Sequence, residues 1–210
     1  SAIPSLPLPC RQTGLSSAMS NPRERLLETA AHLFTERGYE CVGINEIIAK
    51  AGVAKASFYQ HFPSKQDLCA AWLREEAGRS EEGDAAVLAS RKTLRRKVSD
   101  QFDALQCWVD GTCYRGCPFS LTAGMTEAGE ESHAIIREHT LAKRRFWQAL
   151  AKEAPTTAAG ARDLGDAWFL LASGALTQAQ NAGDSWPIAQ ARRTALSLLK
   201  ASSSPSAAKP

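Results

Sequence analysis

Two short helical patterns meet at a glycine turn near residue 52, and this junction restricts the possible fold more than any other feature. Apolar residues recur at helical spacing over 44–50. The tripeptide "AGV" at 51–53 predicts a tight turn centred on Gly52, and a further helix is expected over 54–61. Two short helices joined by a glycine-containing turn are a helix-turn-helix in outline.

The second helix of this pair has two different faces. On a helical wheel of 100° per residue, Phe58 and Phe62 point the same way as Ala51 and predict a buried side. The opposite side carries Lys55, Tyr59 and Gln60, with His61 beside them. The short helix therefore predicts a core on one face and an exposed polar surface on the other.

Helices are also expected on both sides of this pair. Asn21 and Glu24 form a capping box around Pro22, which suits the first helical position, and Gly38 is the expected end of that helix. Tyr39 follows the glycine and can fold back on the last turn. Ser64 is predicted to cap a further helix, which Pro63 separates from its predecessor.

The segment "LFTERGYECVGINEIIAKAGVAKASFYQHFPSKQDL" (33–68) resembles the N-terminal domain of the TetR family of transcriptional regulators. The matching pieces are the Phe-x-x-x-Gly-Tyr pattern at 34–39, Ala-Gly-Val at 51–53 and Phe-Tyr-x-His-Phe-x-Ser-Lys at 58–65. Ile47, Ala49 and Leu68 match as well. The resemblance covers about fifty residues, and the rest of the chain agrees in helical character and length only.

The resemblance implies an all-α protein with an N-terminal three-helix helix-turn-helix DNA-binding domain and a C-terminal helical ligand-binding and dimerisation domain. It implies a homodimer, most simply a repressor, whose recognition helices enter the major groove of a palindromic operator and leave it when a small-molecule inducer binds. Half-sites would lie ~34–36 Å apart or slightly more. The residues that fall where the family contacts DNA are Lys55, Ala56, Tyr59, Gln60, His61 and Lys65.

Those residues would divide into two kinds of contact. Tyr59, His61 and Lys65 are expected to hold phosphates, whereas Gln60 and Lys55 are the better candidates for base edges. The chain departs from the family pattern at the two helix caps, where Gly43 and Ala54 replace the usual Ser or Thr. Ala54 should cost about 1 kcal/mol relative to serine. Ala56 replaces the family's glycine and adds a methyl where the backbone approaches DNA.

The remaining chain is expected to be helical, without strands or repeats. The polar segment 75–85 predicts a hinge between a DNA-binding domain at 21–78 and a second domain at 84–201. Residues 1–20 are expected to be a disordered leader and 202–210 a disordered tail. Helices are predicted over 91–109, 119–128, 131–153, 160–181 and 185–200, with a break at 110–118.

The second domain contains the candidates for ligand contact, because pockets in helical folds lie between helices and are mostly apolar with a few polar groups. The candidates are Phe102, Gln106, Tyr114, Phe119, Met125, His139, Trp147 and Trp168. Trp108, Phe146 and Phe169 are further candidates. Rings at helical spacing are more often ordinary core. The helices at 160–181 and 185–200 fall where the family pairs its subunits. The first is apolar on more than one face and so needs two partners, one of which can come from the second subunit; burial within a single domain is the alternative.

Three cysteines, Cys107, Cys113 and Cys117, surround the predicted break. In "CYRGCP" Arg115 stands between two of them, and a nearby cation lowers a thiol pKa. Cys113 or Cys117 is therefore a candidate sensor of electrophiles or oxidants, as in some members of the family. The alternative is that both are small buried hydrophobic residues. Their spacing matches no zinc pattern, so no metal site is predicted.

Charge and composition agree with this interpretation without proving it. The net charge is +3, and residues 1–74 carry eight Lys/Arg against six Asp/Glu, a surplus of two. DNA binding therefore depends on local arrangement rather than overall charge.

No apolar run is long enough to cross a membrane, no secretory signal is visible, and reducing cytosol is the expected compartment. No nucleophile–base set or phosphate loop supports an enzyme, although a helical small-molecule-binding protein or enzyme is the main alternative. No cofactor is predicted.

Overall fold

A computed structural model describes residues 21–111 and 114–202. This part of the chain is helical and contains no strand, as predicted. The predicted leader (1–20), the tail from 203 and Cys113 lie outside the described residues. The described residues form two compact units: an N-terminal unit of 21–79 with 111–138, and a C-terminal unit of 80–110 with 139–202.

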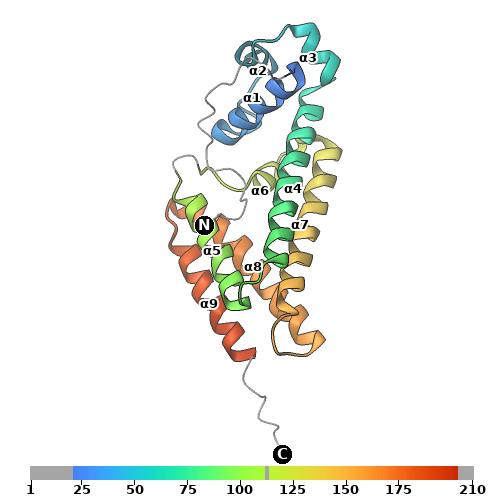
Figure 1. Ribbon diagram of the computed structural model, residues 1–210. Coiled ribbons are helices and arrows are strands. Elements are labelled where there is room, and N and C mark those ends of the chain that lie inside the picture. Colours follow the sequence, from blue (N-terminus) through green and yellow to red (C-terminus); the bar gives the residue numbers. More distant parts are fainter. Residues whose placement is uncertain (1–20, 112–113, 203–210) are drawn as a thin grey trace, which may run out of the picture. The chain divides into compact units, whose positions relative to one another are not determined.

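The N-terminal unit begins with the predicted helices. Its helices are α1 (Pro22–Arg37), α2 (Ile44–Ala51), α3 (Lys55–His61) and the first part of α4 (Lys65–Ala89) (Figure 1). The Asn21 side chain accepts from the Glu24 N–H, and the Glu24 carboxylate accepts from the Asn21 N–H, so the predicted capping box is present. The Ser64 hydroxyl accepts from the Asp67 N–H at 3.2 Å, which confirms the predicted cap of α4.

The core of this unit is built by the residues that the spacing predicted to be buried. Leu26, Leu33, Ile47, Phe58 and Leu68 are each 0% exposed. Tyr39 does fold back, because its ring lies 5.4 Å from that of Phe34 between centroids. Burial of such large side chains, at about 1.5–3 kcal/mol each, is what fixes three short helices that would not be stable alone.

Residues 111–138 belong to the N-terminal unit, whereas the predicted domains assigned them to the second domain. The helix expected over 119–128 is shorter: α6 (Pro118–Ala123) ends before Gly124, and a 3₁₀ turn η1 (Thr126–Ala128) precedes α7 (Gly129–Ala151). Phe119, Ile135 and Ile136 of this segment pack into the N-terminal core, which explains the grouping.

A single backbone carbonyl ties this segment to the end of α1 and the start of α4. The carbonyl oxygen of Glu127 accepts from the Tyr39 hydroxyl at 3.2 Å and from the Gln66 side-chain amide at 3.0 Å. Gly129 follows with a φ of +84°, in the left-handed region. A Cβ there would lie 3.1 Å from the Gln66 side-chain oxygen, so glycine both permits the turn and leaves space for that amide.

The C-terminal unit contains α5 (Leu94–Val109), α8 (Ala158–Ala182) and α9 (Trp186–Ser202), together with the remainders of α4 and α7. Helices α5, α8 and α9 lie side by side (Figure 1). Trp168 of α8 is 0% exposed, and its indole N–H donates to the Ala195 carbonyl of α9 at 3.1 Å. The ring of Trp147 lies 6.1 Å from that of Trp168 between centroids.

Helices α7 and α8 cross at very short range at Gly165. A Cβ on Gly165 would lie 2.5 Å from the Gln148 Cα and 2.9 Å from the Trp147 carbonyl oxygen. Only a residue without a side chain permits this approach. The crossing brings Trp147 and Trp168 into the same core.

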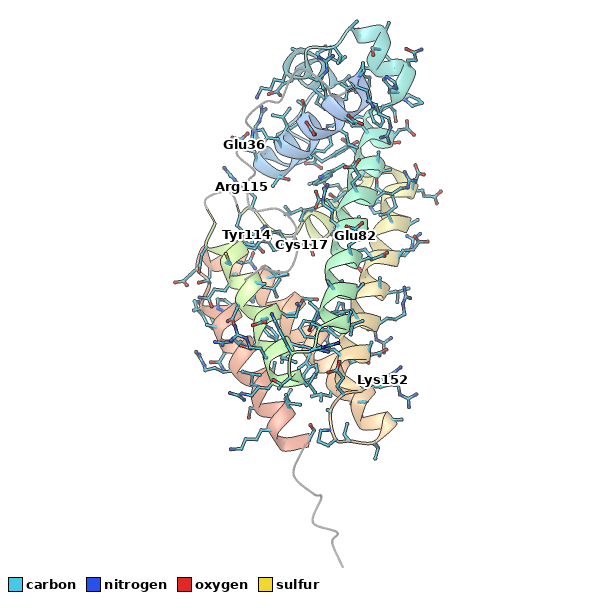
Figure 2. All side chains as sticks on the ribbon, viewed as in Figure 1. Glu36, Glu82, Tyr114, Arg115, Cys117 and Lys152 are labelled. Carbon is cyan, nitrogen blue, oxygen red and sulfur yellow. The ribbon has the colours of Figure 1, made fainter. Side chains whose placement is uncertain are left out.

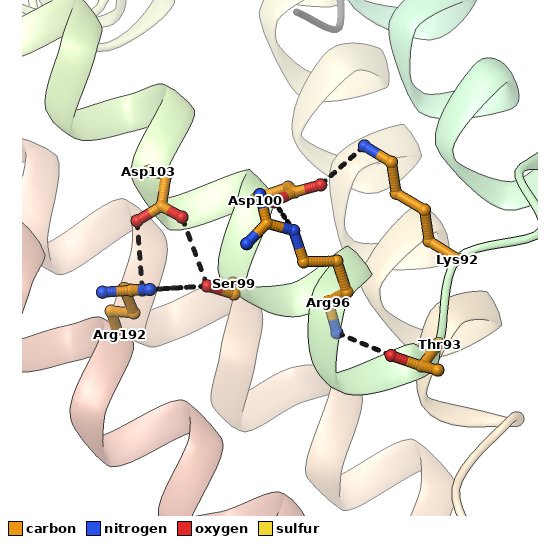
Figure 3. A network of polar contacts seen from close by, with 7 residues as sticks. All are labelled: Lys92, Thr93, Arg96, Ser99, Asp100, Asp103 and Arg192. Carbon is orange, nitrogen blue, oxygen red and sulfur yellow. Dashed lines mark hydrogen bonds and ion pairs between the residues drawn. The ribbon is translucent and has the colours of Figure 1, made fainter. Parts of the chain in front are cut away.

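A polar network connects α5 with α9 on the outside of that core (Figure 3). The Arg192 guanidinium donates to the Ser99 hydroxyl at 2.7 Å and pairs with Asp103 at 3.1 Å. At the start of α5, Asp100 pairs with Lys92 at 2.7 Å and with Arg96 at 2.8 Å. Exposed pairs of this kind contribute little each, so the network chiefly specifies how α9 is aligned on α5.

The boundary between the two units, at Arg79 and Ser80, falls within the polar segment 75–85 where the hinge was predicted, but the helix does not break there. Helix α4 runs without interruption from Lys65 to Ala89 through this segment. Arg79 pairs with Glu75 and Glu76 along the helix, and Val87 is buried beyond them. Tertiary packing and these i,i+3 and i,i+4 pairs outweigh the about 1 kcal/mol that each internal glycine costs.

Candidate nucleic-acid interface

The turn before α3 has the geometry that its glycine predicted. Gly52 is left-handed (φ 62°, ψ 40°), and its N–H donates to the carbonyls of Ile48 and Ala49. Neither Gly43 nor Ala54 caps its helix with a side-chain hydrogen bond. The backbone N–H groups at the start of α2 and α3 therefore lack the side-chain acceptor that Ser or Thr would supply.

The two faces of α3 separate as predicted. Phe58 and Phe62 are 0% and 3% exposed, and their ring centroids lie 6.3 Å apart in the core. Tyr59 is 45% exposed, with its ring packed edge-on at 5.2 Å from Phe58. The other outward residues, all exposed, are Lys55, Ala56, Gln60 and His61. The five α3 residues predicted to contact DNA are thus all exposed; contact itself stays a prediction.

Lys65 lies differently from the α3 residues. Its ammonium is 4.0 Å from the centroid of the Tyr39 ring, and the side chain is half-buried. Desolvation lowers the pKa of Lys65, against the attraction of Glu127 and other nearby acidic groups. The aromatic face holds the ammonium at the first turn of α4. In the predicted phosphate contact, the Lys65 ammonium would therefore already be held in place by the Tyr39 ring before DNA binds.

The cations between Pro22 and Arg74 fall into two groups. Arg37 and Lys50 pair with Glu46 at 2.5 Å and 3.4 Å, and Arg74 pairs with Glu131. Those without an ion pair to any described carboxylate are Arg23, Arg25, Lys55 and Lys65. A cation without an ion pair can bind a phosphate without first breaking an interaction with a carboxylate of the protein.

Two members of the unpaired group were not predicted from the sequence. Arg25 donates to the Gly52 carbonyl at 3.4 Å, and the Arg23 guanidinium carbon lies 5.5 Å from the centroid of the Phe62 ring. Both stand on the first turn of α1 and both contact residues that flank α3. Their place two residues apart in "RER" was visible, but their nearness to α3 is a tertiary property.

The candidate ligand residues divide between the two units. Phe102, Trp147 and Trp168 pack in the C-terminal core, with 5.7 Å between the ring centroids of Phe102 and Trp147. Phe119 and Met125 pack against the N-terminal core. Gln106 and Tyr114 are half-buried. Ligand contact by these residues stays a prediction.

His139 is the histidine among those candidates. Desolvation lowers its pKa to about 4, and the nearby Lys143 ammonium adds to the effect. The ring is therefore neutral at pH 7. Lys143 itself pairs with Asp84 at 2.8 Å, and burial raises the pKa of that carboxyl while Lys143 opposes the shift. This part of α7 therefore carries a neutral imidazole close to an ion pair.

The structure describes two of the three cysteines around the predicted break. Cys117 is half-buried at the start of α6, and Figure 2 shows Tyr114, Arg115 and Cys117 along the segment that leads there. Cys107 is exposed on α5. Burial raises the pKa of Cys69, a core thiol, to about 11, so that thiol is unreactive. Thiol sensing by Cys113 or Cys117 stays a prediction.

Residues 21–111 and 114–202 contain neither a cluster of metal-ligating side chains nor a membrane-spanning helix. No group of three or more His, Cys, Asp or Glu side chains could hold a metal ion there. In the same part of the chain, no helix has the length and apolar character needed to cross a membrane.

Comparison with known proteins agrees with the geometry of α1 to α4. The family model for bacterial regulatory proteins of the tetR family matches residues 26–72. The transcriptional activator FasR of Mycolicibacterium smegmatis is 36% identical over 88 residues, and the match covers 40% of each chain. This chain therefore spans less than half of that relative's length.

Two further comparisons extend beyond that region. The HTH-type transcriptional regulator LmrA of Bacillus subtilis is 32% identical over 160 residues, which cover 64% of this chain and 78% of that one. The crystal structure of SCO4454, a TetR-family regulator of Streptomyces coelicolor, superposes with a TM-score of 0.78 at 22% identity, over 87% of this chain and 96% of that chain. The helix-turn-helix of α2 and α3, the family match and the long alignment agree, and the chain belongs to the TetR family of transcriptional regulators.

Proposed function

We propose that this chain represses transcription as a homodimer that binds a palindromic operator and releases it when a small molecule binds the helices beyond α4. The observation that carries the proposal is the exposed face of α3. Lys55, Tyr59 and Gln60 stand out from a helix whose Phe58 and Phe62 are buried. An amide and an ammonium on such a helix can reach base edges in the major groove, and a phenol can hold a phosphate.

The first test is whether and where the protein binds DNA. Selection of bound duplexes from a random pool should yield a palindrome with half-sites ~34–36 Å or slightly more between centres. Binding should weaken steeply as salt rises, because cations on the protein displace condensed counterions. A helical enzyme or ligand-binding protein without DNA affinity would enrich no sequence and shift no duplex.

Two substitutions on α3 should separate positioning from reading. Tyr59→Ala should weaken binding to every duplex alike, since a phosphate contact carries no sequence information. Gln60→Ala should relax the preference at one base pair by about 1–3 kcal/mol and affect random DNA little. Competition shift assays on the selected operator and its single-base variants would measure both. If Gln60→Ala lowered the affinity for all duplexes equally, Gln60 would not contact a base edge.

The dimer in this proposal would form on the exposed apolar side of α8 and on α9. Leu170 is 65% exposed and Trp186 is 60% exposed, which are unusual values for such large apolar side chains. A second copy of the chain that covered this surface would remove both from water. Two small residues, Ser173 and Gly174, are also exposed on α8 one turn after Leu170, and they would let two such helices approach closely.

Leu170→Glu should therefore raise the dimer dissociation constant at least about tenfold, because a carboxylate would be buried in the subunit contact. Light scattering over a dilution series would measure it. Leu141→Glu is the matched control: Leu141 is 50% exposed but stands on α7, outside the proposed contact. Dissociation by both variants to the same degree would place the contact elsewhere.

Whether the protein represses or activates transcription needs a separate measurement, since FasR is named an activator. A reporter controlled by the selected operator should be silent with the protein and active once an inducer is added. If the reporter were expressed only in the presence of the protein, the protein would be an activator. The proposed DNA binding would be unaffected by that result. Cys117→Ser in the same reporter would show whether an electrophile acts through that thiol.

A further inference from the structure

Arg23 is an exposed cation held beside the recognition helix by an aromatic ring. It stands on the first turn of α1, and its guanidinium carbon lies 5.5 Å from the centroid of the Phe62 ring. Phe62 is 3% exposed and closes the C-terminal end of α3, directly after His61. The core fixes the ring, and the attraction between ring and cation favours this position of the guanidinium.

No described carboxylate neutralises this guanidinium. The acid next to it in the chain, Glu24, accepts from the Asn21 backbone N–H at 3.2 Å and from the Asn21 side-chain amide at 2.9 Å. Arg37, at the other end of the same helix, donates to Glu46 at 2.5 Å. Of the three arginines on this helix, Arg37 is already paired with a carboxylate, whereas Arg23 and Arg25 are not.

We propose that Arg23 binds a DNA phosphate at the edge of the groove that α3 enters. The inference rests on the proposed function, because it requires α3 to lie in a major groove. A helix of seven residues is about 10 Å long, and the groove is about 12 Å wide, so a cation beside the end of the helix lies near a sugar–phosphate backbone. A guanidinium presents its N–H groups in a planar fork that matches phosphate oxygens in pairs.

The proposal enlarges the DNA-binding surface beyond the helix-turn-helix residues. Arg23 would contribute affinity and orientation without reading any base, since phosphate contacts are independent of sequence. Phe62 would act as a positioning residue for that contact, in addition to its place in the core.

The test compares Arg23→Gln with Arg37→Gln in the full chain, on a mixed-sequence duplex, by the slope of log binding constant against log salt concentration. Each phosphate contact contributes about 0.9 to that slope. Arg23→Gln should lower its magnitude by about 0.9 and weaken binding several-fold at low salt, whereas Arg37→Gln should leave the slope as in the wild type. Helicity and melting temperature of each variant would show that both fold.

Arg23→Lys supplies the complementary check. It keeps the charge, so the slope should return to the wild-type value, even though the paired hydrogen bonds of the guanidinium are lost. An unchanged slope in Arg23→Gln, or equal losses in Arg23→Gln and Arg37→Gln, would overturn the Arg23 contact and leave the proposed function standing. A wild-type protein without any salt-dependent DNA binding would overturn both.

Discussion

Replacing Gly165 by alanine should lower the free energy of unfolding by about 2–3 kcal/mol, because two helix backbones would have to move apart. The added Cβ would lie 2.5 Å from the Gln148 Cα and 2.7 Å from its backbone nitrogen. Both atoms are main chain, so no rotamer change relieves the overlap. Alanine also favours a helix by about 1 kcal/mol over glycine, and the overlap should outweigh that gain. Denaturant titration monitored by far-ultraviolet circular dichroism would measure the loss.

Gly78→Ala is the matched control for this prediction. Gly78 also lies inside a long helix, α4, but an added Cβ would meet nothing within 4 Å. The same substitution should therefore stabilise the protein by up to about 1 kcal/mol. Opposite signs at the two glycines would identify the α7–α8 crossing as the cause. A neutral or stabilising Gly165→Ala would mean that the two helices can separate freely.

Phe58→Ala should cost about 3–5 kcal/mol of stability and abolish DNA binding at the same time. Phe58 is 0% exposed and is the central contact of α3 with the N-terminal core. Its loss would leave a cavity under a helix of seven residues, which cannot persist without packing. Thermal or denaturant unfolding would report the first effect, and a shift assay on the selected operator would report the second.

The neighbouring substitution Tyr59→Ala separates the two effects. Tyr59 is 45% exposed, so its removal should change the free energy of unfolding by less than about 1 kcal/mol while DNA affinity still falls. If Phe58→Ala were as stable as Tyr59→Ala, α3 would not depend on its buried face. The exposed face of α3 would then be held in place by something other than the burial of Phe58.

Local signals were sufficient for the N-terminal helices. The capping box at Asn21 and Glu24, the stop at Gly38 and the left-handed Gly52 each act within a few residues, so the sequence alone revealed them. The outward face of α3 followed from periodicity because a helix of known start has only one way to bury Phe58 and Phe62. These features needed no knowledge of distant contacts.

Features that depend on distant contacts were not predicted. The polar segment 75–85 looks like a linker, but packing on either side of it keeps α4 continuous. The grouping of 111–138 with the N-terminal unit depends on contacts made by Phe119 and Ile136. The exposed cation at Arg23 was not predicted for the same reason, since only the fold determines whether a cation has an acidic partner.

The carbonyl of Glu127 has a consequence for anyone who wishes to alter this protein. It belongs to the main chain, so no replacement of the residue 127 side chain removes it as an acceptor for Tyr39 and Gln66. Side-chain substitution can delete a hydrogen bond to that carbonyl only from the donor side, through the phenol or the amide. A library randomised at 39 and 66 would therefore sample the strength of the joint, whereas one randomised at 127 would leave it untouched.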